Sequence, residues 1–131
     1  MGHSFGTLDG LGDGPGFRKV RRALGIRAFG VNGIVFPPGQ LGFEHYHDEQ
    51  DELYFVHSGT AHFEVEGEKR VLGPGGLCHV ESTTSRRVSN ASDTEDLVLL
   101  VIGGKDGYVE RDGHTTTEDD AARRAAFGRP G

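Results

Sequence analysis

A chain of 131 residues, 34% of them hydrophobic, can bury one core without disulfides, which favours a single globular domain. Its formal net charge of -6 repels phosphate backbones and its longest purely apolar run, 97–102, is far too short to span a membrane, so neither nucleic acid nor membrane is an expected partner. The single cysteine, Cys78, excludes an intrachain disulfide and is typical of a reducing compartment, which predicts a cytoplasmic protein.

Residues 1–25 divide into two parts. Residues 1–16 are rich in glycine and aspartate and cannot bury enough apolar surface to order themselves, so a flexible arm is predicted. In the part that follows, Phe17, Val20 and Leu24 recur at steps of three and four residues, and Gly25 stands where a helix commonly ends. This spacing predicts one short helix.

From Ile26 onward, short runs of β-branched and aromatic residues alternate with clusters of glycine and proline at intervals of about eight to twelve residues, as in sandwiches and barrels. The 22 glycines of the chain fit many turns between short strands. We therefore predict an all-β fold: an antiparallel barrel or jelly roll of six to eight strands, with short peripheral helices at the termini. The predicted strands are 28–36, 43–47, 53–57, 61–66, 77–80, 86–90 and 97–102.

After Asp112 the chain becomes polar, so 113–131 are predicted to form a C-terminal tail. Thr117 and Asp120 have the spacing of a weak capping box at the start of a helix, and Gly128 and Pro130 stand where that helix would stop. The tail can therefore form a short helix on the outside of the barrel or against a partner subunit.

His45 and His47 are two residues apart, so on a strand both imidazoles leave the same face. Glu52 follows a short polar turn and heads an apolar strand. If that strand turns back antiparallel beside its predecessor, Glu52 lies opposite the histidine pair. Two imidazoles and one carboxylate that converge inside a barrel form a facial triad, which suits Fe(II) or Mn(II) and leaves coordination positions open. The three residues are therefore candidate ligands of a divalent metal ion.

These residues resemble the first motif of the cupin family, which reads glycine, five residues, His-X-His, three or four residues, Glu, six residues, glycine. Every spacing is met, by Gly39, His45, His47, Glu52 and Gly59. The resemblance covers about 26–102 and implies a cupin β-barrel domain at 17–112. It also implies a divalent metal ion such as Fe, Mn, Ni or Zn, and a homodimer formed through barrel edges and terminal arms.

The second cupin motif reads glycine, five residues, Pro-X-Gly, two residues, His, three residues, Asn. Gly75 and Asn90 match it, but the proline and the second glycine are replaced, and Arg86 stands where the family has its fourth metal ligand. A guanidinium stays protonated and offers only donors, so Arg86 cannot bind a metal ion.

Two interpretations of Arg86 stay open. Tyr54 shares the parity of Glu52, so it either reaches the same pocket or bonds a backbone carbonyl in the barrel core. In the first interpretation, the triad holds a metal ion and Arg86 binds a substrate carboxylate or phosphate. The protein is then a metal-dependent oxygenase, lyase or isomerase acting on a small carboxylated or oxygenated compound, with its catalytic residues unassigned. In the second, the metal is lost, Glu52 pairs with Arg86, and the protein is a non-catalytic binding or sensor protein for a small anion or sugar.

Overall fold

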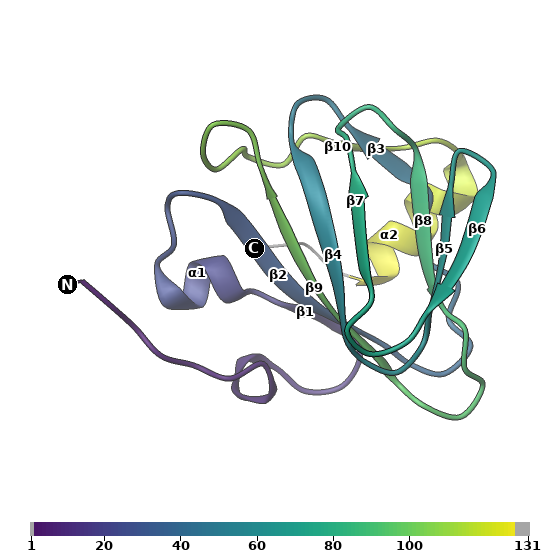
Figure 1. The fold of residues 1–131 in the computed structure, drawn as a ribbon, viewed down its shortest axis with the longest axis horizontal. Coiled ribbons are helices and arrows are strands. Elements are labelled where there is room, and N and C mark those ends of the chain that lie inside the picture. Colours follow the sequence, from purple (N-terminus) through teal and green to yellow (C-terminus); the bar gives the residue numbers. More distant parts are fainter. Residues whose placement is uncertain (1, 128–131) are drawn as a thin grey trace.

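The computed structural model describes residues 2–127, which fold into two antiparallel sheets packed face to face (Figure 1). One sheet has the strand order β1-β2-β9-β4-β7, and the other has the order β10-β3-β8-β5-β6. The strands are β1 (Gly16–Arg18), β2 (Gly30–Phe36), β3 (His45–His47), β4 (Asp51–Ser58), β5 (Ala61–Val65), β6 (Glu68–Leu72), β7 (Leu77–Val80), β8 (Arg86–Asn90), β9 (Leu97–Gly104) and β10 (Gly113–Thr115).

The inner faces of the two sheets share one apolar core. In β9, Leu97, Leu99 and Val101 are buried, whereas the residues between them are only half-buried. This alternation places one face of the strand against the opposite sheet. The other buried core residues are Phe36, Tyr54, Val56, Ala61, Phe63, Val80, Val88 and Phe127.

The predicted all-β jelly-roll fold is confirmed, but the predicted number of strands is wrong. The described residues form ten strands rather than six to eight. The sequence gives no sign of β6 because it lies at an exposed sheet edge, and three of its five residues are charged. β1 and β10 have three residues each, too few for an alternating pattern. Within residues 2–127, no helix is long and apolar enough to cross a membrane.

The N-terminal helix is shorter than predicted. Phe17 lies in β1 opposite Ile34 of β2, and α1 covers only Val20–Leu24. Phe17 packs against the core, and this tertiary contact overrides the helical spacing of the sequence. α1 ends at Gly25 in the left-handed conformation, with φ of 71° and ψ of 31°, as predicted. The segment before β1 contains one turn of 3-10 helix, η1 (Asp9–Leu11).

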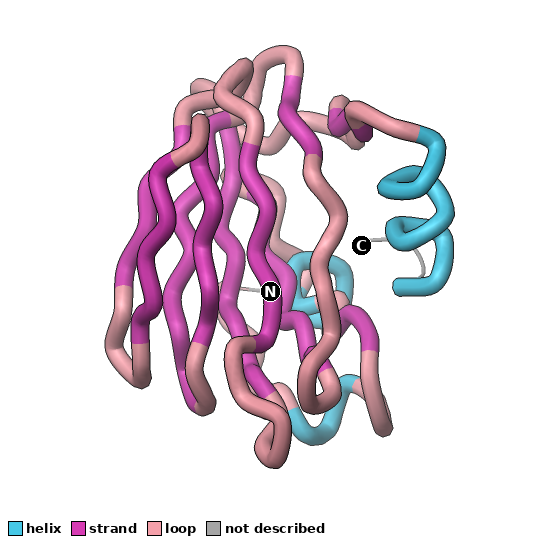
Figure 2. Tube along the Cα trace, turned by 90° about the vertical axis from the view of Figure 1, so that its right-hand side faces the viewer, coloured by secondary structure: helices cyan, strands magenta, loops and turns pink. Residues whose placement is uncertain are grey.

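Residues 113–127 pack against the barrel. β10 pairs antiparallel with β3, and the helix α2 (Glu118–Phe127) follows it beside the strands (Figure 2). Thr117 caps the helix as predicted, because the backbone N–H of Asp120 donates to its Oγ1 over 3.1 Å, and the Asp120 carboxylate accepts from the Thr117 hydroxyl over 3.1 Å. The predicted stop residues, Gly128 and Pro130, lie outside the described residues.

α2 contacts both sheets. Near its start, the carboxylate of Asp120, only 2% exposed, accepts hydrogen bonds of 2.7 and 3.2 Å from the guanidinium of Arg87 on β8. At its end, the ring of Phe127 lies 4.9 Å from that of Phe36 on β2 and 5.6 Å from that of Phe43, just before β3. The helix therefore closes the space between the sheets on this side.

Candidate metal centre

Three side chains converge on one point between the sheets. Nε2 of His47 lies 3.1 Å from Oε1 of Glu52, and Nε2 of His45 lies 3.8 Å from the same oxygen. One ligand atom from each residue lies within 4.8 Å of the others. His47 is buried, and the other two are half-buried. The structure thus brings together the three residues that the sequence singles out.

Glu52 reaches the histidines by a route other than the predicted one. β4, which carries Glu52, pairs with β7 and β9, whereas β3, which carries both histidines, pairs with β8 and β10. The predicted pairing of β3 with β4 is wrong, because the turn at 48–50 carries the chain from one sheet to the other. The three side chains instead meet across the space between two packed sheets, where inward-facing residues of both sheets interdigitate.

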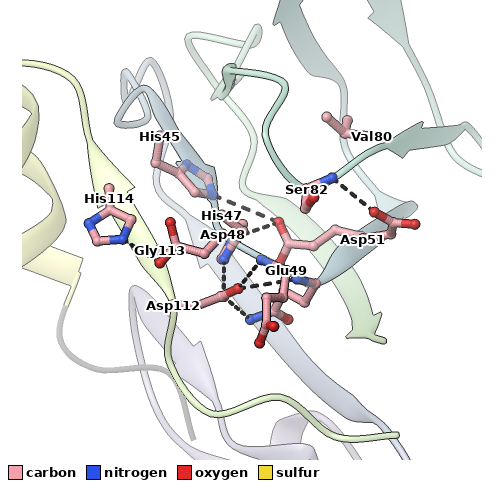
Figure 3. Close-up of polar contacts among 12 residues, drawn as sticks. His45, His47, Asp48, Glu49, Asp51, Val80, Ser82, Asp112, Gly113 and His114 are labelled. Atoms are coloured by element: carbon pink, nitrogen blue, oxygen red, sulfur yellow. Dashed lines mark hydrogen bonds and ion pairs between the residues drawn. The ribbon is translucent and has the colours of Figure 1, made fainter. Parts of the chain in front are cut away.

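A fourth residue, Asp112, holds His47 in place. Its Oδ1 accepts a hydrogen bond of 2.7 Å from Nδ1 of His47. Its Oδ2 accepts hydrogen bonds from the backbone N–H groups of Glu49 and Gln50, over 2.7 and 3.1 Å (Figure 3). The side-chain amide of Gln50 donates to Oδ1 over 2.7 Å. The sequence does not point to Asp112, since it follows His47 by 65 residues and only the pairing of β10 with β3 brings it here.

The Nδ1 contacts fix the direction of both imidazoles. Nδ1–H of His47 donates to Asp112, and Nδ1 of His45 lies 3.3 Å from the carbonyl oxygen of Phe43. Each Nε2 of the neutral rings therefore presents its lone pair toward Glu52. Two lone pairs and a carboxylate at these distances repel one another unless a cation, a proton or a metal ion, lies between them.

The electrostatics of the site keep both carboxyl groups ionised. Burial opposes ionisation of Glu52, but the close imidazoles of His45 and His47 outweigh it and hold the pKa of Glu52 well below its usual range. Burial lowers the pKa of His47, yet the hydrogen bonds and charge of its acidic neighbours raise it overall. Burial likewise opposes ionisation of Asp112, but hydrogen bonds, led by that of Gln50, lower its pKa to about 2.

Tyr54, the predicted substrate contact, holds Glu52. Its hydroxyl donates to Oε1 of Glu52 over 2.8 Å, and its side chain is buried. Burial, together with the negative charge of Glu52, raises the pKa of Tyr54 well above its ordinary value, so the hydroxyl stays protonated. Tyr54 also lines the cavity described below, and its contact with a substrate stays a prediction.

Arg86 lies on β8 opposite His45, but it does not line the cavity. It is completely buried, and its terminal nitrogens donate to the carbonyl oxygens of residues 80–82 over 3.2 to 3.4 Å. Within the described residues no ion pair joins it to Glu52, so the pair expected from the metal-free interpretation does not form. The guanidinium therefore ties the segment after β7 to β8, and its predicted contact with a substrate anion stays a prediction.

The three converging side chains open onto a cavity of about 410 Å³. In the sheet, Glu52 lies opposite Gly103, which lies opposite Gly30, so no side chain of β9 or β2 fills the space beside the carboxylate. The side chain of Gln50 lies over Gly103 so closely that a Cβ there would collide with it. Gly103 therefore makes room for the side chain of Gln50, and both glycines line the cavity next to the candidate ligands.

Two cationic side chains reach the same cavity, Arg124 of α2 and Arg111 of the segment before β10. Arg124 donates to the carbonyl oxygen of Gly113 over 3.1 Å. Gly113 lies against the ring of His47, where a Cβ would be 3.1 Å from Cε1. Neither arginine has an acidic partner within 4.0 Å in the part of the chain that is described. The helix expected outside the barrel thus contributes uncompensated positive charge to the cavity wall.

The residues present fit a divalent metal ion. Nε2 of His47 is a buried nitrogen with no hydrogen-bond partner in residues 2–127, and it faces Glu52 and Nε2 of His45. Imidazole and carboxylate are common ligands of Fe, Mn, Ni and Zn. Three protein ligands leave coordination positions for water or a substrate.

Comparisons with known proteins agree with this geometry. The model of the cupin domain family matches residues 34–103. A cupin protein from Bacteroides fragilis has a TM-score of 0.68 at 23% identity, over 90% of this chain and 95% of that chain. A putative sugar phosphate isomerase from Acidithiobacillus ferrooxidans has a TM-score of 0.58 at 30% identity, over 66% and 56% of the two chains. The DMSP lyase DddQ from Ruegeria pomeroyi has a TM-score of 0.59 at 26% identity, over 68% and 43%. The comparison with curated proteins found no match.

Proposed function

This chain belongs to the cupin family, whose domain model matches residues 34–103 of its 131, and we propose that it is a divalent-metal-dependent enzyme acting on a small carboxylated or otherwise oxygenated compound. The observation that carries the proposal is the convergence of His45, His47 and Glu52 at the wall of a cavity, with a buried, unpartnered Nε2 on His47. A cluster that served only the packing of the barrel would gain nothing from lone pairs aimed at a carboxylate.

In this proposal, His45, His47 and Glu52 hold the ion. Asp112 fixes the orientation and the tautomer of His47, and the hydroxyl of Tyr54 fixes Oε1 of Glu52. When bound, the ion supplies a Lewis acid that polarises an oxygen of the substrate. The apolar part of the cavity wall keeps water away from that oxygen, which strengthens each electrostatic contact.

The cavity and its charge support a small anionic substrate. A volume of about 410 Å³ lies in the range of small-molecule sites. Arg111 and Arg124 offer cationic donors that no carboxylate of the described residues occupies, and Arg124 connects to the ring of His47 through Gly113. A substrate carboxylate can therefore bind the arginines while another oxygen of the same molecule faces the histidines.

The likenesses at 25% identity or more favour a lyase or an isomerase over an oxygenase. The structures at 26% and 30% identity include a DMSP lyase and a putative sugar phosphate isomerase. One barrel can carry many chemistries, so the reaction class rests on these two likenesses and not on the fold.

Thermal unfolding in the presence of small carboxylates and sugars, with and without a chelator, tests the proposal. We expect protein reconstituted with Fe(II), Mn(II), Ni(II) or Zn(II) to be stabilised by some of the carboxylates, and chelation or His47→Ala to remove that stabilisation. His57→Ala, at an exposed histidine of β4, is the matched control and should keep it. Stabilisation that survives chelation would overturn metal dependence and favour a non-catalytic binding protein. NMR spectra in which every stabilising compound stays unconverted would overturn the enzymatic part.

The anionic substrate class has its own test. Arg124→Gln should weaken binding of a stabilising carboxylate about tenfold or more, because it removes a charged hydrogen-bond donor from the cavity wall. Arg123→Gln, on the same helix but outside the cavity, should change that affinity less than twofold. Equal losses in the two variants would mean that the helix charge acts only at long range.

A further inference from the structure

Asn32 is a polar side chain on the inner face of a strand that is otherwise apolar there. In β2 it shares its face with Ile34 and Phe36, and both pack in the core. In the sheet it lies opposite Val101 of β9, and Val101 lies opposite Tyr54 of β4. Asn32 therefore lines the cavity in the cross-strand row Asn32–Val101–Tyr54, next to the row that contains Glu52. Its neighbour on the adjacent strand, Val101, offers no polar group.

The carboxamide oxygen of Asn32 has no hydrogen-bond partner within residues 2–127. This atom, Oδ1, is buried. A buried amide oxygen that gives up water without gaining a hydrogen bond lowers stability, and an apolar side chain of similar size would be more stable there. Native structures contain few such atoms, and many of those mark a functional site where the missing partner is a ligand.

No side chain of β2 or β9 separates Asn32 from the candidate metal ligands, and the side chains of Gln50 and Tyr108 lie over the two glycines there. Glu52, Gly103 and Gly30 form one cross-strand row, and Asn32 lies in the adjacent row, two residues from Gly30 along β2. Asn32, both glycines and Glu52 line one continuous cavity. β2 and β4 are separated by two strand spacings, about 10 Å, so a single small molecule several atoms long can touch both Asn32 and the ligand cluster.

We propose that Asn32 is a specificity residue that recognises a hydroxyl group on the substrate, at the end opposite the oxygens that face His45, His47 and Glu52. A hydroxyl both donates and accepts, so it can bind the amide N–H of Asn32 and, once the carboxamide rotates, satisfy the buried Oδ1 as well. The substrate class is then a hydroxylated carboxylate rather than a simple short acid. This inference rests on the proposed function for the identity of the site, but its stability argument concerns Asn32 alone.

The first experiment measures stability without any ligand. Asn32→Leu should raise the melting temperature by about 3 °C or more, because it removes an unsatisfied polar group from an apolar wall. Asn32→Ala, which requires no additional room, should leave the melting temperature within about 2 °C of the wild type despite the lost side-chain contacts. Gln40→Leu, a half-buried amide outside the cavity, controls for a general effect of replacing an amide by leucine. If both Asn32 variants melt lower by 5 °C or more, Asn32 has a structural partner and the proposal is wrong.

The second experiment measures ligand preference by calorimetry, with the pairs 6-hydroxyhexanoate and hexanoate, and gluconate and hexanoate. Wild-type protein should bind the hydroxylated member of a pair at least tenfold more tightly, and Asn32→Leu should lose that preference while its metal affinity changes less than twofold. Equal binding of both members by the wild type, or an unchanged preference in Asn32→Leu, would overturn the proposal. Metal titration of the same samples separates failure of the proposed function from failure of the proposal for Asn32. A wild type that binds no metal ion refutes the proposed function, and the hydroxyl preference is then judged by the ligand titrations alone.

Discussion

Replacing Asp112 by asparagine tests how the protein prepares His47 for a metal ion. The backbone N–H groups of Glu49 and Gln50 both point at Oδ2 and require an acceptor there. The amide oxygen must therefore take that position, which places the amide nitrogen against Nδ1 of His47. Nδ1 then has to accept rather than donate, and the imidazole proton moves to Nε2, the atom that faces Glu52.

The expected loss is about 10- to 100-fold in metal affinity, the usual effect of removing the carboxylate partner of a metal-binding histidine. This range corresponds to about 1.4 to 2.7 kcal/mol. An independent estimate comes from the contact itself: a hydrogen bond of 2.7 Å from His47 to a charged group is lost, worth about 1.5 to 3 kcal/mol. The two estimates agree in size.

Isothermal titration with Zn(II) or Mn(II) measures this loss in the wild type and in Asp112→Asn. Asp48→Asn is the matched control, because Asp48 forms an exposed pair with His114 beside the site and its replacement makes the same change in charge. The control should bind metal within twofold of the wild type. An Asp112→Asn variant within threefold of the wild type, or a control that loses as much, would refute the role given to Asp112.

Three further outcomes are expected. Asp120→Asn should lower the free energy of unfolding in urea by about 2 kcal/mol, because it removes the charge of a buried carboxylate that binds the half-buried guanidinium of Arg87. Asp119→Asn, on the exposed face, should cost less than about 0.5 kcal/mol. Burial raises the pKa of Asp120, but hydrogen bonds, led by that of Arg87, lower it overall. The stability that the carboxylate adds is therefore present above about pH 4 and is lost as the pH falls further. The free energies of unfolding of wild type and Asp120→Asn should approach each other in acid, and a constant difference down to about pH 2 would contradict this. Gly113→Ala should weaken metal binding severalfold by pressing on the His47 ring, whereas Gly73→Ala, with open space around it, should not; equal affinities in calorimetry would show that the ring yields freely.

The candidate ligands could be predicted from the sequence because their arrangement is local. The alternation of a strand sends His45 and His47 to one face, and Glu52 follows after a short turn. The residues that complete the site could not be predicted in this way. Asp112 and Arg124 reach it only because β10 pairs with β3 and α2 folds back over the barrel, and no local period encodes such contacts.

The fold shows the same division. Strands with clear apolar alternation, such as β9, follow directly from the sequence, whereas the charged edge strand β6 does not. The helical spacing of Phe17 was misleading because its contact with the core decides its structure. For Arg86 the sequence excluded a role as metal ligand, but the direction of its guanidinium depends on the carbonyl oxygens of 80–82. The predicted homodimer stays a prediction.

The central claim is that His45, His47 and Glu52 bind one metal ion. Diffraction at the absorption edge of the metal, from crystals of protein loaded with Zn(II) or Mn(II), measures this directly. We predict one anomalous peak per chain at about 2.0 to 2.2 Å from Nε2 of each histidine and from a carboxylate oxygen of Glu52. A loaded crystal with no peak between these side chains, or with its ion held by other residues, would contradict the claim.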